Sequence, residues 1–445
     1  MKRGIVLCLA LTGLLLLAPK AAHCEIGTID DVPGATLLLP YFELDLASAE
    51  GITTLFSINN ASATAVLAHV TLWTDMSIPT LDFDVYLTGY DVQTINLRDI
   101  FNGVLPVTAS AGQDPKDTIS PHGPVSQDIN FASCATFFPF SNPALNSTLL
   151  NHIRAAHTGK ASTVFSGRCS GANYGDNVAR GYITVDTVSS CNLLFPNSVG
   201  YFTGVATTQN VLWGDYFYVN QAENFAQGET LVHVEACSAP SVGNGAGNCP
   251  FTAGDYTFYG RYVGGAGTDQ REPLATTFAS RYITGGGFDG GTDLIVWRDS
   301  KTTPTGANGP FSCAAGGPSW FPLNQADVVA FDESEHATDL CVADGDNVSP
   351  PIGEEQTCFP LESQRVHIGT GNVIGNDPNP PYTFGWLFLN LNTTVASGIF
   401  NPTAQAWVTT TMDANGRFSV GYDAIQLDNA LYTHAAGFGG NVILP

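Results

Sequence analysis

The chain has 445 residues, of which 44% are hydrophobic and 11% aromatic, and this apolar content excludes an intrinsically disordered protein and indicates two or three folded domains. Its formal net charge of −24 creates a field that repels nucleic acid and anionic lipid, so neither is expected as a partner. The 47 glycines and 26 prolines are typical of a turn-rich β protein.

The N-terminus has the pattern of a secretory signal peptide. Two basic residues precede an apolar run over 5–17, and small residues around Ala22 favour cleavage before Glu25. A membrane anchor is the first alternative, but a span needs about 20 apolar residues. A lipoprotein acylated at Cys24 is the second, and His23 fits its processing signal poorly. We therefore expect residues 1–24 to be removed and the mature chain, without a transmembrane segment, to reach the periplasm or the cell surface.

Strands with period-2 alternation dominate the first part of the mature chain. Residues 53–58, 65–73, 81–87 and 92–97 each alternate apolar and polar side chains and are separated by turn residues. Short strands at this spacing predict an antiparallel β-sandwich of the immunoglobulin-like kind. We place this N-terminal β-sandwich at residues 25–130.

A middle β segment is predicted at residues 131–270. It starts with one helical insert, where Asn142 can cap a helix over 145–157 that ends before Gly159. Strand patterns follow it. They cover residues 180–186, 211–219 and 230–236.

A second β-sandwich is predicted at residues 271–445. Its sharpest feature is a hairpin, in which strands 404–411 and 417–424 flank a turn that ends at Gly416. The turn also resembles the start of an EF-hand loop, but the glutamate of the twelfth position and the flanking helices are missing.

The two predicted sandwiches also share an order of strand motifs, which suggests an internal repeat. The motifs of the first lie at residues 37–42, 54–58, 70–75 and 92–97, and those of the second at 278–282, 292–297, 327–332 and 364–368. Two sandwiches of one ancestry would give this order, and so would coincidental strand patterns.

Four strings of residues carry a resemblance to known proteins: Leu39-Pro40-Tyr41-Phe42, Ser57-Ile58-Asn59-Asn60, Leu72-Trp73-Thr74-Asp75 and Arg180-Gly181-Tyr182-Ile183-Thr184-Val185-Asp186. Together they resemble an uncharacterised family of secreted bacterial proteins with immunoglobulin-like β modules. The shared motifs are structural, so the resemblance implies a fold and a compartment, and it implies no reaction and no functional residues.

Eight cysteines remain after residue 24, and in an exported chain an even number indicates disulfides. They are Cys134, Cys169, Cys191, Cys237, Cys249, Cys313, Cys341 and Cys358. Zinc binding is the alternative, but the sequence contains no C-x-x-C pair that would support it. Short loops favour the pairs 169–191, 237–249 and 341–358, which leaves 134–313.

Candidate catalytic residues are sparse. The sequence lacks the G-x-S-x-G elbow of serine hydrolases, and His152 and His157 lie on different faces of the predicted helix. Asp82 and Asp84 share one face of a strand, but an exposed face would not separate their pKa values as a glycosidase requires. We therefore expect no catalytic residues.

Oxygen-rich turns leave calcium as the one candidate cofactor, in a structural role. Asp344, Asp346 and Asn347 are the first candidate ligands, and the turn over 289–293 is the second. A solvated turn without an ion explains the same residues.

Aromatic residues of the middle segment are the candidate ligand-binding residues. Trp213 and Phe217 fall on one strand face, whereas Tyr216 and Tyr218 fall on the other. We expect one face to be core and the tyrosine pair to be exposed, so that Trp213, Tyr216 and Tyr218 could form a sugar-binding platform.

The sequence thus favours a non-enzymatic extracellular or cell-envelope protein with a structural or adhesive role and an unknown protein or glycan partner. One alternative is a carbohydrate-binding protein that uses exposed aromatic side chains. Another is a hydrolase whose site has no recognisable motif.

Overall fold

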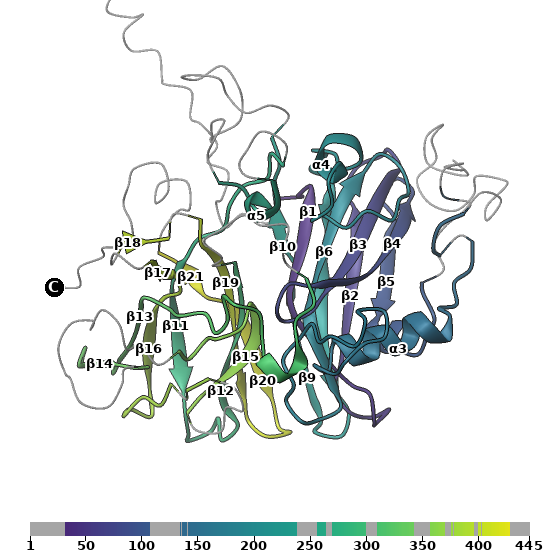
Figure 1. The fold of residues 1–445 in the computed structure, drawn as a ribbon. Helices are drawn as coiled ribbons and strands as arrows, with labels where there is room; N and C mark the ends of the chain where they lie inside the picture. Colours follow the sequence, from purple (N-terminus) through teal and green to yellow (C-terminus); the bar gives the residue numbers. More distant parts are fainter. Residues whose placement is uncertain are drawn as a thin grey trace, which may run out of the picture.

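The structure is a computed structural model that describes residues 32–106, 134, 136–139, 141–237, 256–263, 269–299, 309–341, 357–369, 375–376, 378–395, 399–401 and 403–427. The predicted signal peptide and the predicted calcium ligands Asp344, Asp346 and Asn347 lie outside these residues. Within them the chain is mostly β, with four antiparallel sheets of four or five strands and a few short helices (Figure 1). The expected all-β class is confirmed.

Ten strands build a first sandwich. They are β1 (Thr36–Asp45), β2 (Thr53–Asn60), β3 (Val66–Trp73), β4 (Pro79–Leu87), β5 (Val92–Asn96), β6 (Val178–Val188), β7 (Leu212–Trp213), β8 (Asp215–Asn220), β9 (Phe225–Thr230) and β10 (Val232–Val234). The β1 sheet has the order β10-β1-β6-β3-β4, and the β2 sheet has the order β5-β2-β8-β9 with β7 beside β2. Leu39, Val70 and Ile183 of the β1 sheet share one buried core with Phe56 and Ile58 of the β2 sheet.

The strands of a second sandwich follow. They are β11 (Thr277–Ile283), β12 (Gly291–Asp299), β13 (Asp327–Phe331), β14 (Ala337–Asp339), β15 (Ser363–Ile368), β16 (Phe384–Asn390), β19 (Gln405–Asp413), β20 (Ser419–Asp423) and β21 (Ile425–Gln426), with β17 (Thr394–Val395) and β18 (Ile399–Phe400) paired separately. The β11 sheet has the order β14-β13-β16-β11-β21, and the β12 sheet has the order β15-β12-β19-β20. Phe278 and Leu387 pack against Leu294 and Val408 in a second core.

The two sandwiches have the same strand order. Replacing β10, β1, β6, β3 and β4 by β21, β11, β16, β13 and β14 converts the β1 sheet into the β11 sheet. Replacing β5, β2, β8 and β9 by β15, β12, β19 and β20 converts the β2 sheet into the β12 sheet. The predicted internal repeat is therefore confirmed in strand order, whereas the immunoglobulin-like topology stays a prediction.

The predicted middle segment supplies central strands to the first sandwich. Strand β6 pairs with β1 on one side and with β3 on the other, and β8 pairs with β2. Strand pairing therefore runs across the boundary expected at residue 130. Pairing partners far apart in sequence leave no local signal, because the alternation of one strand does not say which strand lies beside it.

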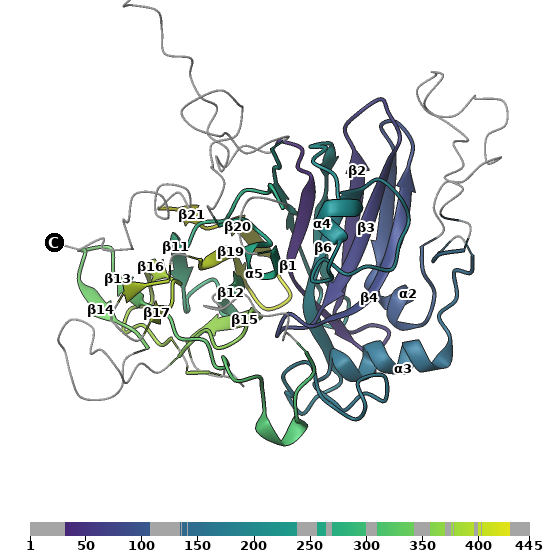
Figure 2. The same ribbon diagram turned by 45° about the horizontal axis from the view of Figure 1, so that its top comes forward.

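The predicted helix is α3 (Ser147–Ala156), which lies beside β4 and the short helix α2 (Leu97–Phe101) (Figure 2). Its cap differs from the prediction, because the side chain of Asn146 accepts the hydrogen bond from Leu149 N. Asn142 instead accepts from Ala144 N in the preceding turn. Two further short helices are α4 (Tyr201–Gly204) and α5 (Gly260–Val263). None of the described helices combines the length and the apolar character needed to cross a membrane.

The predicted C-terminal hairpin is formed by β19 and β20, which pair from Thr409–Asp423 to Asp413–Ser419. At its turn Asn415 and Gly416 have φ values of 43° and 74°. Glycine takes this left-handed conformation without steric cost, so Gly416 allows the tight reversal.

Three disulfides are described: Cys134–Cys191, Cys169–Cys313 and Cys341–Cys358. The predicted pair 341–358 is confirmed, whereas the predicted pairs 169–191 and 134–313 are wrong because the partners are exchanged. Short loops suggested the wrong pairs, but a bridge between Cys169 and Phe311 places Cys169 next to Cys313. Cys237 is also disulfide-bonded, and its predicted partner Cys249 lies outside the described residues.

The sandwiches contact each other through the outer face of the β12 sheet, which packs on the first sandwich. Ile295 on this face joins the buried core of the first sandwich. Beside it, the indole of Trp297 meets the ring of Tyr182 edge-on, with centroids 6.0 Å apart. Apolar side chains of one sandwich thus complete the packing of the other.

Polar contacts fix this intrachain interface in one register. The Ser363 hydroxyl donates to Pro40 O at 2.7 Å, and the Arg365 guanidinium donates to Glu43 at 2.7 Å and Asp293 at 2.6 Å. These bonds connect β15 and β12 to β1. We therefore expect the sandwiches to unfold as one cooperative unit.

Shortening Ile295 should test this coupling. Ile295→Val is expected to lower the free energy of unfolding by about 1 kcal/mol, because a buried methyl group is lost. Urea denaturation followed by tryptophan fluorescence should show this loss in a single transition. Ile425→Val is the matched control, because Ile425 is 63% exposed and its variant should unfold like the wild type. Two separate transitions would contradict the coupling.

Candidate binding faces

The histidine and the two aspartates of the predicted strand pair come together, but they are buried. Strands β3 and β4 pair His69 with Asp84, and His69 Nδ1 lies 2.9 Å from Asp84 Oδ1. Asp82 Oδ2 lies 3.7 Å from His69 Nε2. The prediction of an exposed acidic face is wrong, because α4 and its neighbours cover this side of the β1 sheet.

Burial controls the titration of this cluster. Desolvation raises the pKa of Asp82 to about 6, and it also raises the pKa of Asp84 against the opposing effect of His69. Desolvation would lower the pKa of His69, but the hydrogen bond and charge of Asp84 raise it overall. Since His69 is fully buried, a substrate cannot reach this group in the described structure. The arrangement is that of a buried ion pair within a sheet.

A second buried charge cluster was not predicted from the sequence. The Arg271 guanidinium lies 3.4 Å from Asp186 and 3.5 Å from Asp269, and it also contacts the hydroxyl of Thr36. The Tyr201 hydroxyl donates to Asp186 at 2.8 Å. Asp186 ends a predicted strand, and nothing in the local sequence indicates that an arginine 85 residues later would pair with it.

The aromatic residues of β7 and β8 occupy the predicted faces, but the exposed face is the other one. Tyr216 and Tyr218 are buried in the first core, so the prediction of an exposed tyrosine pair is wrong. Trp213 and Phe217 are 42% and 44% exposed on the outer face of the β2 sheet. Alternation separated the two faces, but both carry rings, so the sequence could not tell which one meets the core.

Polar and small residues surround these two rings on the outer face of the β2 sheet. Trp213 lies opposite Asn59, and Asp215 accepts a hydrogen bond of 2.7 Å from the Ser57 hydroxyl between the rings. Phe217 lies opposite Gly228, where a Cβ atom would stand 2.3 Å from the ring. Glycine therefore allows the ring to lie over β9. We name Asn59, Trp213, Asp215 and Phe217 the open β2 face.

A second aromatic face lies on the outer side of the β11 sheet. Phe331 and Trp386 pair across β13 and β16, and their rings stack with centroids 4.0 Å apart. Phe384 is 51% exposed on the same face, and Arg281 pairs with Trp386 from the neighbouring strand. We name Arg281, Phe331, Phe384 and Trp386 the open β11 face. This face was not predicted from the sequence, although residues 384–388 alternate with the period of a strand.

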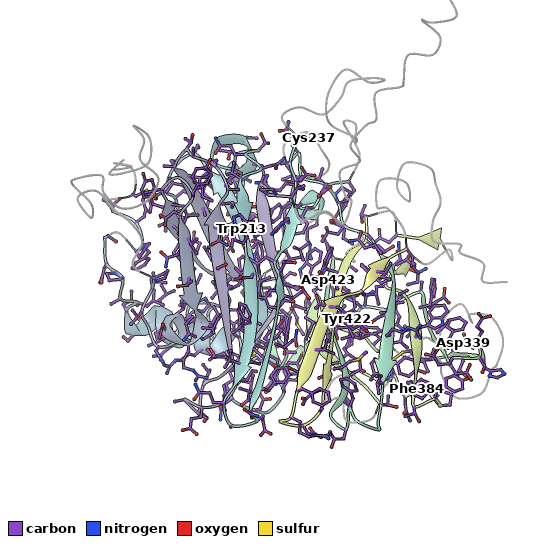
Figure 3. The ribbon with its side chains drawn as sticks, turned by 180° about the vertical axis from the view of Figure 1, so that it is seen from behind. Trp213, Cys237, Asp339, Phe384, Tyr422 and Asp423 are labelled. Carbon is purple, nitrogen blue, oxygen red and sulfur yellow. A yellow bond between two sulfur atoms is a disulfide. The ribbon has the colours of Figure 1, made fainter. Side chains whose placement is uncertain are left out.

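The two open faces lie in different sandwiches. Figure 3 shows Trp213 over the first sandwich and Phe384 near the far end of the second, with Tyr422 and Asp423 between them.

In the second candidate calcium turn, residues 289–293, both acidic side chains pair with arginines. Asp289 accepts from Arg417 at 2.7 Å, and Asp293 accepts from Arg365. Arg365 and His367 beside it hold the pKa of Asp293 below its usual range, although burial alone would raise it. Among the described residues no group of three or more histidine, cysteine or acidic side chains could hold a metal ion.

Comparison with known proteins gives no further guide to these faces. No family model matches the chain, and neither a curated protein nor a solved structure matches it. The resemblance to secreted bacterial proteins therefore stays a prediction, and the function has to be inferred from the geometry.

Proposed function

We propose that the chain is a non-enzymatic structural or adhesive protein of the periplasm or the cell surface, which binds through open β-sheet faces. The observation that carries this proposal is the half-exposure of Trp213 and Phe217 on the outer face of the β2 sheet. Exposed apolar patches on folded proteins commonly mark interaction sites. The described disulfides support an oxidising compartment, because such bonds persist mainly outside the cytoplasm.

The placement of the reactive groups supports a binding role over catalysis. His69 and Asp84 form a closed pair inside the β1 sheet, and Arg271 and Asp186 form another. A hydrolase would need such acids at a cleft that a substrate can enter.

The proposal includes two immunoglobulin-like modules. It is supported by consecutive strands such as β1 and β2, which lie in opposite sheets, as they do in Greek-key sandwiches.

Carbohydrate binding is the second candidate function, and one observation favours it. Asp215 and Ser57 place polar groups between two exposed rings, and glycan sites often combine aromatic faces with a few polar groups.

Retention of coated microspheres on surfaces tests the proposal. Microspheres carrying the mature, oxidised protein should be retained on at least one of three coatings: cellulose, purified bacterial sacculi or the protein itself. Trp213→Ala combined with Phe217→Ala should reduce retention at least tenfold, because both exposed rings are lost. Phe418→Ala is the matched control, since Phe418 is 52% exposed outside both open faces. Retention on none of the coatings, or equal retention of the double variant, would contradict a binding role for this face.

A further inference from the structure

The intrachain interface has a recurring aromatic element. On the outer face of the β1 sheet, Trp73 of β3 and Tyr182 of β6 pair across the strands and stack in parallel, with centroids 5.7 Å apart. Trp297 of the second sandwich packs edge-on against Tyr182, and Tyr262 of α5 stacks on Trp73 with centroids 5.8 Å apart, so that together they bury this pair. The interface is thus a β12 outer face seated on a β1 outer face.

The second sandwich repeats the receiving half of this interface at its open end. Strands β13 and β16 are the counterparts of β3 and β6, and they carry the stacked pair Phe331 and Trp386. Trp73 and Tyr182 are buried, but Phe331 and Trp386 are partly exposed. The same aromatic surface is therefore covered by the second sandwich together with α5 in one case, and it is uncovered by described residues in the other.

The first sandwich repeats the other half of this interface, which is the outer face that the β12 sheet contributes. In the β12 sheet, Trp407 of β19 lies opposite Trp297 and packs against the aromatic cluster at the interface. In the β2 sheet the counterpart position is Trp213, which lies opposite Asn59 and is 42% exposed.

The glycine beside the rings is repeated as well. Gly228 of β9 lies opposite Phe217, and Gly421 of β20 occupies the corresponding place opposite Thr411. At Gly421 the missing Cβ leaves room for Gln227 of the first sandwich, whose amide would otherwise stand 2.1 Å away. The open β2 face therefore has the shape of a face that already serves as an interface once in this chain.

We infer that the open β2 face of one molecule docks on the open β11 face of a second copy, which repeats the intrachain interface between molecules. The inference rests on the proposed function, because both assign the open β2 face to binding. Such a contact joins two different surfaces and leaves one of each unused at the ends of every assembly. Copies then add head to tail and extend into a chain of alternating sandwiches.

One local feature fits a second copy as the occupant. Asp215 is the one charged residue named on the open β2 face, and its charge is opposite to that of Arg281 on the open β11 face. The Arg281 guanidinium pairs with Glu333 at 2.7 Å, but its side chain is 60% exposed, so it can also contact an incoming carboxylate.

The net charge sets the conditions for assembly. A formal charge of −24 on each copy opposes association over long range, and salt screens this repulsion. We therefore expect longer assemblies at high salt than at low salt, which is the opposite of an interface held mainly by ion pairs.

Mixing two blocked variants tests the inference. Trp213→Lys blocks the open β2 face and Phe384→Lys blocks the open β11 face, and each variant alone should sediment as a monomer under conditions where the wild type assembles. An equimolar mixture should form dimers and stop there, because it contains one intact pair of faces. Phe418→Lys is the matched control and should assemble like the wild type. Thermal melting of each variant confirms that it is folded.

Each other result overturns head-to-tail docking. Self-association of the Phe384→Lys variant alone would show that like faces pair, and a mixture that stays monomeric would show that the two faces do not meet. A wild type that remains monomeric at high salt and high concentration would overturn it too. If microspheres are then still retained on cellulose or sacculi through Trp213, the proposed function stands and the open β2 face binds glycan instead.

Discussion

Replacing Arg271 by methionine is expected to destabilise the fold by about 3–5 kcal/mol, because breaking a buried ion pair leaves its carboxylates uncompensated. Arg271 is almost fully buried between Asp186 and Asp269, and its guanidinium also donates to Thr207 O at 3.1 Å. Methionine fills similar space but offers no donor. The group links β1 and β6 to the segment that precedes β11, so its loss should weaken both sandwiches together.

Chemical denaturation of dilute protein measures this effect. Arg281→Met is the matched control, because Arg281 forms an exposed pair with Glu333 and such pairs contribute about 0–1 kcal/mol. The measurement is made at about pH 8, above the raised pKa of Asp269, which is about 6. Equal midpoints for the two variants there would show that the carboxyl groups around Arg271 need no compensating charge, and the buried ion pair would then not stabilise the fold.

Stability should fall as the pH rises from about 4 to about 8. Burial raises the pKa of Asp75 to about 7, and it raises the pKa values of Asp82 and Asp269 to about 6. Each folded carboxyl then keeps a proton that the unfolded chain releases near its ordinary pKa of 3.8. The stabilisation is complete below that ordinary pKa and is lost as the pH passes through the raised one.

Asp75 is the sharpest test of this dependence, because its carboxyl is buried beside the intrachain interface, where it accepts a hydrogen bond from Ala172 N at 3.0 Å. A shift of about three pH units corresponds to about 4 kcal/mol. Between about pH 4 and about pH 8, Asp75→Asn should therefore gain up to this amount relative to the wild type. Burial lowers the pKa of His157 to about 3, and the titration of this group makes stability rise with pH instead. Both proteins contain His157, so its effect cancels in the difference between Asp75→Asn and the wild type.

Asp176→Asn is the control for the pH series. Arg180 beside it lowers the pKa of Asp176 against the effect of burial, so its titration falls below the window and its variant should follow the wild type. Unfolding free energies from urea titrations at several pH values provide the measurement. A constant difference between Asp75→Asn and the wild type across the window would mean that Asp75 is charged throughout.

The elements that the sequence predicts well are those whose signal is local. Alternation identified β3, β4 and the β19–β20 hairpin, because apolar and polar side chains alternate along each strand, even in β3 and β4, where both faces are buried. It could not place β6 between β1 and β3, since this arrangement depends on a chain reversal over more than a hundred residues. The predicted pairs 169–191 and 134–313 failed for the same reason, whereas the short loop 341–358 was predicted correctly.

For the candidate faces, too, the sequence predicted what depends on local patterns and not what depends on long-range packing. The order of motifs in the two halves indicated a repeat, and the shared strand order bears it out. The sequence could not tell that the β12 face is covered by the first sandwich while its counterpart in the β2 sheet stays open. That difference in exposure arises only when the two sandwiches pack against each other. The first sandwich contributes the outer face of its β1 sheet to the contact, and the second contributes the outer face of its β12 sheet. Trp213 and Trp407 therefore have the same place in the fold and different exposure.

The cross-link Cys169–Cys313 has a mechanical consequence. It joins the two sandwiches covalently across 144 residues of sequence. When the molecule is pulled from its two ends, tension passes through this bond. The Cys134–Cys191 bond keeps residues 170–190 in the loaded path, whereas residues 192–312 carry no load. The protein should behave as a stiff link while the bond is oxidised. After reduction the same force would extend residues 192–312 as well, so the redox state of the surroundings would set how far one molecule lengthens under load.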